Sequence, residues 1–305
     1  MIEVLGFGLA GACVALQLQR AGYAVRVVDD GRPGSSNVAA GLVNPVAGRN
    51  FEPSWEVAEA WAVARPFYAD LAEDLFHPMP ILRLWRDEQD RTKFERKRPG
   101  VEPWLAKVSA EGVLWHGGGW LDCPRFLEVA KREFLANGGE WGGMGEPSEQ
   151  VWCCGAAGLI RGDFEDVPHR SAKGEILTVR VSGWEEYRIL NRNGWVIPLG
   201  DDRYRVGASY EWEDLDSNPT VAGRARVEDI LRSFTNRPFE VIDHVAGIRP
   251  IIHRSRPVIL YQKGRGWMVN GLGSKGVIYA PRVGLELVKH LSQAQHSKKA
   301  GVGNA

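Results

Sequence analysis

The chain opens with a short apolar run that a group of glycines separates from a helical pattern. Residues 2–5, Ile-Glu-Val-Leu, have the composition of a strand, and residues 12–20 carry apolar side chains at helical spacing. Gly22 then stands where a helix commonly ends, and residues 23–28 form a second strand-like run that stops at Asp29. This order predicts a strand, a glycine turn, a helix and a second strand.

A similar pattern lies near the other end of the chain. Residues 266–270 favour a strand, residues 271–276 form a second glycine-rich turn, and an amphipathic pattern predicts a helix that ends near Leu291. The residues beyond Gln295 are mostly small or polar, and we expect residues 296–305 to form a disordered tail.

The central part of the chain carries short apolar runs at close spacing. Helices are predicted from about residue 54 to residue 76 and from residue 221 to residue 234. Asn193-Gly194 is a strong signal for a hairpin turn. The pattern predicts an antiparallel sheet here, with strands at 81–85, 175–181, 186–191, 195–199 and 203–209.

The composition is that of a globular protein without excess charge. Lys and Arg number 38 and Asp and Glu number 38, so a basic surface for nucleic acid or anionic lipid is not indicated. The four cysteines form no Cys-x-x-Cys pair, and the seven histidines lack metal-ligand spacing. No apolar run is long enough for a transmembrane helix. We therefore expect a cytoplasmic protein that holds no metal and contacts no membrane.

The first glycine turn reads Gly6-Phe7-Gly8-Leu9-Ala10-Gly11, a G-x-G-x-x-G sequence between a strand and a helix. Gly6 would allow the tight turn, Gly8 would let a pyrophosphate approach the backbone, and Gly11 would let the helix pack close to the strand. The free N–H groups of the helix start attract phosphate. Asp29 or Asp30 would bind the ribose, and we favour Asp29 because it directly follows the strand. The alternative is an ordinary strand–helix–strand unit with a glycine turn.

Two further segments of small residues would complete a dinucleotide site. Residues 31–45, which include Ser36 and Ala40-Gly41-Leu42, cannot sustain a long helix. They would run beneath a large flat ligand or form a surface loop. The second glycine turn, residues 271–276, precedes a helix and suits another polar contact with the same ligand.

Together these motifs resemble the D-amino-acid oxidase and glycine oxidase superfamily of FAD-dependent enzymes. The resemblance extends to residues 152–158, where the family has an apolar strand ending in Gly-Ala, and to residues 173–177, where it has a strand that starts Arg-Gly-Glu. Gly247-Ile248-Arg249-Pro250 matches the family's Gly-x-Arg-Pro sequence. The second glycine turn is also similar to the oxidase domain of the bifunctional enzyme that matures 5-aminomethyl-2-thiouridine in tRNA.

The resemblance implies an α/β protein with a Rossmann-like, glutathione-reductase-like FAD-binding domain and an inserted substrate domain built on an antiparallel sheet. The FAD-binding domain would comprise residues 1–60, 120–170 and 245–295, and the substrate domain residues 61–119 and 171–244. FAD would be bound non-covalently. The expected contacts with FAD are Gly6, Gly8, Leu9, Ala10, Gly11, Asp29, Asp30, Ser36, Ala40, Gly41, Leu42, Gly155, Gly158, Arg249, Gly271, Gly273, Ser274, Lys275, Gly276 and Val277.

The resemblance also implies hydride transfer to the flavin from a carbon that bears an amine. Arg249 matches the family arginine that binds the substrate carboxylate, and its alternative role is a structural pair with an acid such as Asp243. Tyr210 and Tyr279 would each offer a hydroxyl near the flavin, unless they belong to the core. Lys275 would lie at the pyrimidine edge of the flavin, or on the surface.

Three functions are compatible with these expectations. The first is oxidation of a small amine or amino acid, with oxygen or another carrier as the electron acceptor. The second is oxidation of a substituted amine on a tRNA wobble uridine, which the balanced charge disfavours. The third is a flavoprotein subunit that needs a partner for activity. Arg49 would reach a phosphate or the substrate, and His253, Arg254 and Arg256 would attract an anionic substrate or form a solvated strand edge.

Overall fold

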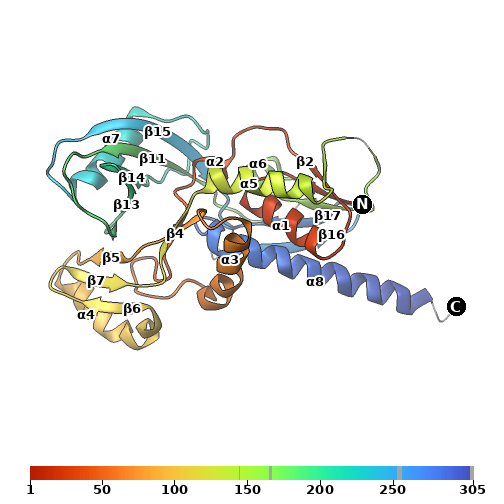
Figure 1. Ribbon diagram of the computed structural model, residues 1–305, viewed down its shortest axis with the longest axis horizontal. Coiled ribbons are helices and arrows are strands. Elements are labelled where there is room, and N and C mark those ends of the chain that lie inside the picture. The colour runs from red at the N-terminus through yellow and green to blue at the C-terminus, as the bar shows by residue number, and fades with distance from the viewer. Residues whose placement is uncertain (144, 165–166, 253–255, 303–305) are drawn as a thin grey trace.

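The computed structural model describes residues 1–143, 145–164, 167–252 and 256–302, which build two large sheets with helices packed on them (Figure 1). The first sheet is mostly parallel. Its strands are β1 (Ile2–Leu5), β2 (Val25–Val28), β9 (Glu140–Trp141), β10 (Glu149–Trp152), β16 (Val258–Gln262) and β17 (Gly266–Asn270). They lie in the order β16-β17-β10-β1-β2-β9, and every neighbouring pair is parallel except β16 with β17.

Four helices pack on one another beside this sheet. They are α1 (Leu9–Arg20), α3 (Val57–Leu71), α5 (Cys123–Ala136) and α8 (Gly276–Val302). Helix α1 touches both α5 and α8, and α3 packs against α8. Their apolar faces and strands β1 and β2 form a buried cluster that includes Val4, Val14, Phe126 and Leu287. Each such side chain contributes about 1.5–3 kcal/mol by leaving water.

The second sheet is mostly antiparallel and occupies the left side of Figure 1. Its strands are β5 (Ile81–Leu84), β6 (Leu105–Val108), β7 (Gly112–Trp115), β11 (Ala172–Arg180), β12 (Ile189–Asn191), β13 (Trp195–Gly200), β14 (Arg203–Gly207) and β15 (Glu240–Arg249). They lie in the order β15-β11-β14-β13-β12-β5-β7-β6, and β12 with β5 is the parallel pair. Helix α7 (Val221–Arg232) packs on β11 and β14.

Smaller elements connect the two sheets. A three-stranded sheet joins β3 (Leu42–Val43), β8 (Gly119–Leu121) and β4 (Phe76–Pro78), with β8 in the middle. The remaining helices are α2 (Ser35–Val38), α4 (Glu88–Lys97) and α6 (Gly155–Arg161), together with two short 3-10 turns at Arg98–Gly100 and Glu102–Trp104. None of the helices that the structure describes is both long and apolar enough to cross a bilayer.

The predicted α/β fold, with a parallel sheet and a large antiparallel sheet, is confirmed. The hairpin at Asn193-Gly194 is also confirmed, because β12 and β13 pair across it and Asn193 has the positive φ of 55° that this turn requires. The strand expected at 186–191 is shorter and begins at Ile189.

The ends of two helices were also predicted wrongly. The helix expected from residue 54 to residue 76 covers only Val57–Leu71, since Phe76 instead pairs with Leu121 in a strand. The last helix runs through to Val302 and does not end near Leu291, so its backbone occupies most of the segment 296–305 that we expected to be disordered. Residues 245–249 lie at the end of β15 and pair with β11, and their assignment to the FAD-binding domain stays a prediction.

Candidate active site

A cavity of about 1090 Å³ lies where the two sheets meet. One part of its wall comes from the turn between β1 and α1, from residues 29–42 and from the turn before α8. The opposite part comes from the antiparallel sheet, with Gly174, Ile176, Asn191 and Trp195 among its residues. The cavity therefore joins the predicted dinucleotide turns to the predicted substrate domain.

The turn between β1 and α1 needs its glycines because the backbone is crowded there. Gly6 has a φ of +93°, and a Cβ on it would lie 2.8 Å from the carbonyl oxygen of Cys153. A Cβ on Gly11 would lie 1.9 Å from the carbonyl oxygen of Gly6, so Gly11 allows the helix to pack on the turn. A Cβ on Gly8 would lie 2.9 Å from Oγ of Ser36, at the cavity wall. Gly6 and Gly11 thus allow the tight turn and the close helix packing that we predicted, and the approach of a pyrophosphate at Gly8 stays a prediction.

Asp29 holds this turn in place. Its Oδ2 accepts a hydrogen bond of 2.7 Å from the backbone N–H of Phe7, and its Oδ1 accepts one of 2.9 Å from Gly31. Asp30 is exposed and pairs with Arg32 at 2.6 Å. Both aspartates line the cavity, but Asp29 is the one joined to the glycine turn. This geometry is in keeping with our preference for Asp29 as the ribose ligand.

The first turn of α1 faces the cavity with its N–H groups. Helix geometry leaves these groups without partners inside the helix, and the N-cap Gly8 has no side chain to satisfy them. The hydroxyl of Ser36 accepts from the N–H of Leu9 at 3.0 Å. The first turn carries no acidic residue, so the positive end of the helix dipole is open to an anion.

The second glycine turn meets the first one. A Cβ on Gly276, the first residue of α8, would lie 3.0 Å from a methyl carbon of Leu9, the first residue of α1. Gly273 donates from its N–H to the carbonyl of Pro250 at 3.0 Å, which fixes the turn beside the end of β15. Lys275 lines the cavity from this turn, and burial lowers the pKa of its ammonium group.

Arg249 ends β15 and lies on the cavity wall. Its guanidinium carbon sits 4.3 Å from the centre of the Tyr210 ring, and Nη1 donates to the carbonyl of Ser209 at 3.4 Å. In the part of the chain that the structure describes, no carboxylate pairs with this guanidinium, and burial lowers its pKa. Asp243, the structural partner that the sequence left open, instead accepts from the N–H of His244. Arg249 is thus a partly buried cation that faces the cavity without an anion.

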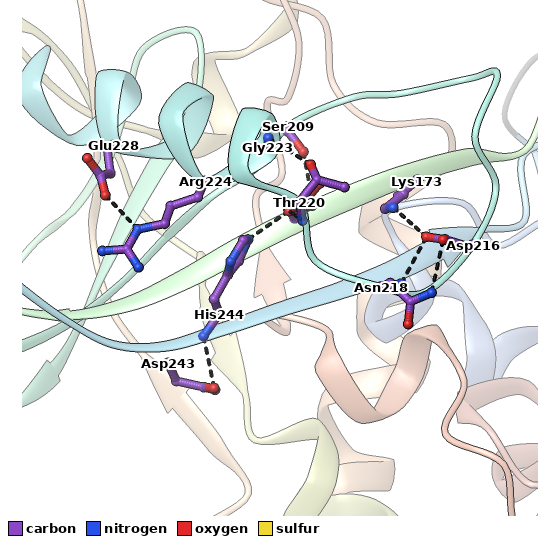
Figure 2. A network of polar contacts seen from close by, with 11 residues as sticks. Lys173, Ser209, Asp216, Asn218, Thr220, Gly223, Arg224, Glu228, Asp243 and His244 are labelled. Atoms are coloured by element: carbon purple, nitrogen blue, oxygen red, sulfur yellow. Dashed lines mark hydrogen bonds and ion pairs between the residues drawn. The ribbon is translucent and has the colours of Figure 1, made fainter.

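A polar network holds the segment that carries Ser209 and Tyr210 (Figure 2). The carboxylate of Glu175 on β11 accepts from the hydroxyl of Thr220 at 2.8 Å and lies 2.7 Å from Nε2 of His244. The backbone N–H of Glu175 donates to the hydroxyl of Ser209 at 2.9 Å. Because Ser209 and Tyr210 both contact Arg249, this network positions the surroundings of the guanidinium.

The same segment has a second anchor. Lys173 is 1% exposed, and its ammonium group pairs with Asp216 (Figure 2). The hydrogen bond from Lys173, together with those from the backbone and side chain of Asn218, lowers the pKa of Asp216 to about 2. Lys173 and Glu211 also exchange backbone hydrogen bonds of 2.8 and 3.0 Å. Residues 209–220 are therefore tied to β11 at several points.

The structure brings most of the predicted cofactor residues to the cavity. Gly11, Gly158 and Gly271 do not line the cavity, and they pack against neighbouring backbone or side chains instead. The predicted residues that line the cavity are Gly6, Gly8, Leu9, Ala10, Asp29, Asp30, Ser36, Ala40, Gly41, Leu42, Gly155, Arg249, Gly273, Ser274, Lys275, Gly276 and Val277, with Tyr210 and Arg49.

Tyr279 does not lie where we expected it. It is 2% exposed, and its hydroxyl donates to the carbonyl of Trp55 at 2.7 Å. Burial raises the pKa of this hydroxyl to about 12. Tyr279 belongs to the core between α8 and the segment before α3, where its hydroxyl is bonded to Trp55.

Sequence reasoning missed two arginines of the cavity wall, Arg83 and Arg86. The sequence did carry a signal for Arg83, because it stands in the apolar run Ile-Leu-Arg-Leu, where a charged residue is unusual. Of the basic cluster expected beside Arg249, His253 and Arg254 lie outside the described residues, and Arg256 lies 5.2 Å over the ring of Trp55. Within the described ranges no cluster of His, Cys, Asp and Glu could hold a metal.

The chain is similar in sequence to a known family and to known proteins. The family model for FAD-dependent oxidoreductases named DAO matches residues 2–142 and 143–290. The chain is 28% identical over 342 residues to the ThiO protein of Rhizobium etli, whose name assigns it to thiamine biosynthesis as an oxidoreductase. That match covers 98% of this chain and 99% of its relative.

A second relative is a larger protein. The MnmC protein of Idiomarina loihiensis, a tRNA 5-methylaminomethyl-2-thiouridine biosynthesis bifunctional protein, is 21% identical over 324 residues. The match covers 92% of this chain and 54% of MnmC, so this chain spans about half the length of that relative.

Two solved structures show the same fold. An iminodiacetate oxidase from a Chelativorans species superimposes with a TM-score of 0.79 at 20% identity, and 93% of each chain is covered. A glycine oxidase from Bacillus cereus gives a TM-score of 0.77 at 17% identity, with 96% of this chain and 95% of the other covered.

The residues of the cavity fit FAD, the cofactor of this family. The N–H groups of the first turn of α1 and the bare backbone at Gly8 suit a pyrophosphate. Asp29 offers carboxylate oxygens to a ribose at the end of β2. The second glycine turn and Ala40-Gly41-Leu42 supply walls of small residues for a flat ring. The guanidinium of Arg249 lines the same cavity.

Proposed function

Since the chain belongs to the DAO family of FAD-dependent oxidoreductases, we propose that it oxidises the C–N bond of an amine that carries a carboxylate, such as an amino acid. The observation that carries this proposal is the guanidinium of Arg249. It lies on the wall of the cavity that also holds the dinucleotide turns, and no described carboxylate neutralises it. A partly buried guanidinium in this state favours an anionic ligand that it can bind with two parallel hydrogen bonds.

The residues around Arg249 would orient such a substrate. Arg249 holds the carboxylate, and Tyr210 covers one side of the guanidinium at 4.3 Å. The tie between Glu175 and Thr220 keeps the segment of Tyr210 in place. When FAD is bound, it supplies the acceptor for the hydride that leaves the carbon beside the amine. Lys275 adds a positive charge to the same cavity, which favours anionic groups at the ring.

The names of the relatives support the proposal. ThiO and glycine oxidase are named for oxidoreductase and oxidase activities, and glycine is an amine with a carboxylate. A second candidate function is oxidation of a substituted amine on tRNA, which the match to MnmC favours. That function requires binding of tRNA that weakens steeply with salt, and a filter-binding titration at two salt concentrations tests it.

The proposal is tested by anaerobic reduction of the purified holoprotein. Its visible spectrum should show an oxidised flavin, and glycine, sarcosine, proline and D-amino acids are then added separately without oxygen. We expect at least one of them to bleach the flavin absorbance. Holoprotein that is reduced by dithionite but by none of these amines would count against amine oxidation. A protein that neither contains nor takes up FAD would count against the cofactor site itself.

A further inference from the structure

The cavity has a second cationic wall, which the proposed function does not use. Arg49, Arg83 and Arg86 line it at one end. The acidic residues on the described cavity wall are Asp29 and Asp30, and both belong to the glycine turn of the parallel sheet. The part of the cavity beside the antiparallel sheet is therefore lined by guanidinium groups without a carboxylate.

Arg83 and Arg86 are held by one buried carboxylate behind the wall. Arg83 is 4% exposed, its guanidinium carbon lies 3.6 Å over the ring of Phe51, and Nη2 is 3.6 Å from Asp90. Arg86 donates to the same oxygen of Asp90. Burial lowers the pKa of Arg83 to about 10, so its guanidinium remains charged at neutral pH. One aspartate thus serves two arginines.

Arg49 adds a third guanidinium. Arg83 donates to the carbonyl of Gly48, the residue before Arg49. The buried Arg83 therefore helps to fix the position of the backbone that carries the exposed Arg49. Arg49 has no ion pair with any described residue. Arg83 and Arg86 share the carboxylate of Asp90, and Asp87 adds a second negative charge near Arg86. Arg49 pairs with neither, so its positive charge is uncompensated among the described residues of this end.

This wall is separated from Arg249 by the width of the sheet. Arg249 ends β15, and Arg83 lies in β5, with β11, β14, β13 and β12 between them. Five steps of about 4.8 Å give roughly 24 Å along the sheet, an upper limit because sheets curve and side chains reach inward. The cavity wall follows this path through Gly174, Trp195 and Asn191. Because four strands lie between β15 and β5, a ligand that touched both ends would extend across the intervening strands.

We propose that Arg49, backed by Arg83 and Arg86, binds a second anionic group of the substrate. This inference rests on the proposed function, and it narrows the substrate to an elongated amino acid whose far end carries a carboxylate or a phosphoryl group. The carboxylate beside the amine would be held by Arg249, and the far group by Arg49. The pyrophosphate of FAD does not explain this wall, because its site is the N-terminus of α1 on the other sheet.

Redox-inert ligands test the inference without turnover. We would titrate the holoprotein with linear dicarboxylates of increasing length and with monocarboxylates of the same length. The change in flavin absorbance and in tryptophan fluorescence reports binding. We expect dicarboxylates above a threshold length to bind about tenfold more tightly than the matched monocarboxylates. Phosphonoalkanoates of the same lengths then show whether the far site prefers a phosphoryl group to a carboxylate.

Two variants test whether Arg49 causes the tighter binding of long dicarboxylates. Arg49→Gln should remove the tenfold advantage of the long dicarboxylates and leave monocarboxylate affinity unchanged. The matched control is Arg192→Gln. Arg192 also lines the cavity, but its guanidinium is engaged elsewhere, since it donates to the carbonyl of Ser233 and lies 5.5 Å over the ring of Phe234. This control should keep the advantage.

The outcomes separate this inference from the proposed function. If dicarboxylates bind no better than monocarboxylates, or if Arg49→Gln weakens both classes alike, the second anionic site is wrong, although flavin reduction by amines would still support amine oxidation. If instead tRNA displaces the monocarboxylate and long dicarboxylates show no advantage, the wall serves a polyanion, and the small-molecule inference is overturned. Failure of all amines to reduce the flavin contradicts the proposed function, whatever the titrations show.

Discussion

The guanidinium of Arg249 lies directly against the backbone of Gly174, so that a Cβ on Gly174 would be 2.0 Å from Nη2 of Arg249. The two residues are diagonal neighbours on adjacent strands, since Gly174 pairs with Gly247 and Arg249 pairs with Ala172. Gly174 thus creates the space in which the guanidinium lies flat on the sheet. Tyr210 closes the other side at 4.3 Å, and the cation is left open only toward the cavity.

This relationship makes Gly174→Ala a test of the position of Arg249. The added methyl group would expel the guanidinium from its place, and a carboxylate ligand would lose a charge-assisted hydrogen bond of about 1.5–3 kcal/mol. We expect the affinity for glycine or acetate to fall roughly tenfold to hundredfold, while FAD stays bound. Titration of flavin absorbance measures this. Gly100→Ala is the control, because a Cβ at Gly100 meets nothing within 4 Å. Unchanged affinity in Gly174→Ala would show that ligands do not contact Arg249.

Asp29→Ala should weaken the retention of FAD. The variant loses the carboxylate that accepts from Phe7 and Gly31 and that we expect to bind the ribose. Each charged hydrogen bond is worth about 1.5–3 kcal/mol, so the dissociation constant of FAD should rise at least tenfold. Ultrafiltration of the holoprotein measures the flavin that is released. Asp30→Ala is the matched control, and equal release from both variants would argue against Asp29 as the ribose ligand.

Lys275→Met should stabilise the protein in its FAD-free form. Burial holds the pKa of Lys275 below its usual value of 10.5, so the folded state disfavours the charged form. Between the lowered pKa and 10.5 the unfolded chain binds more protons than the folded chain, so wild-type stability rises with pH across that window. We expect the advantage of Lys275→Met in urea unfolding to be largest at neutral pH and to shrink as the pH approaches 10.5. An advantage that does not change with pH would contradict a buried charge.

Asp216→Asn should reveal the contribution of the tie to Lys173. The pKa of Asp216 is lowered from 3.8 to about 2, so its contribution is fully present above pH 3.8 and is lost as the pH falls toward 2. We expect the variant to be less stable than the wild type at pH 6 and equally stable near pH 2. Thermal unfolding at a series of pH values measures the difference. A gap that persists at pH 2 would mean that the tie acts through packing and not through charge.

Much of the cofactor site could be predicted from the sequence because its parts are local. Gly6, Gly8 and Gly11 stand in one contiguous motif whose spacing is visible in the sequence, although the atoms that crowd Gly6 and Gly8 come from Cys153 and Ser36. The same holds for the hairpin at Asn193, where a positive φ marks the turn. Arg249 was recognised from its immediate neighbours in Gly-x-Arg-Pro. Such features can be recognised in the sequence without knowing how distant segments pack.

The features that were missed depend on contacts between distant segments. Tyr279 follows the glycine turn closely in sequence, yet the packing of α8 against the segment at Trp55 buries its hydroxyl. In the sequence, Arg83 is a single polar residue in a strand. Its hydrogen bond to Gly48 and its ion pair with Asp90 form only when the three segments pack together. The helix predicted to reach residue 76 ends at Leu71 because Phe76 finds a strand partner in Leu121. Long-range pairing overrode local preference in each case.

The dinucleotide turn, the acid after β2 and the hairpin could be predicted from short-range sterics and spacing, and Arg249 was predicted from the resemblance of Gly-x-Arg-Pro to the family sequence. The tertiary structure alone decided that Gly174 makes room for Arg249, that no described acid neutralises this cation, and that Arg49, Arg83 and Arg86 share one cavity wall. The physical reason is that the electrostatic energy of a charged side chain depends mainly on the groups within a few ångströms of it. Those neighbours come from other strands, and only the folded sheet places them there.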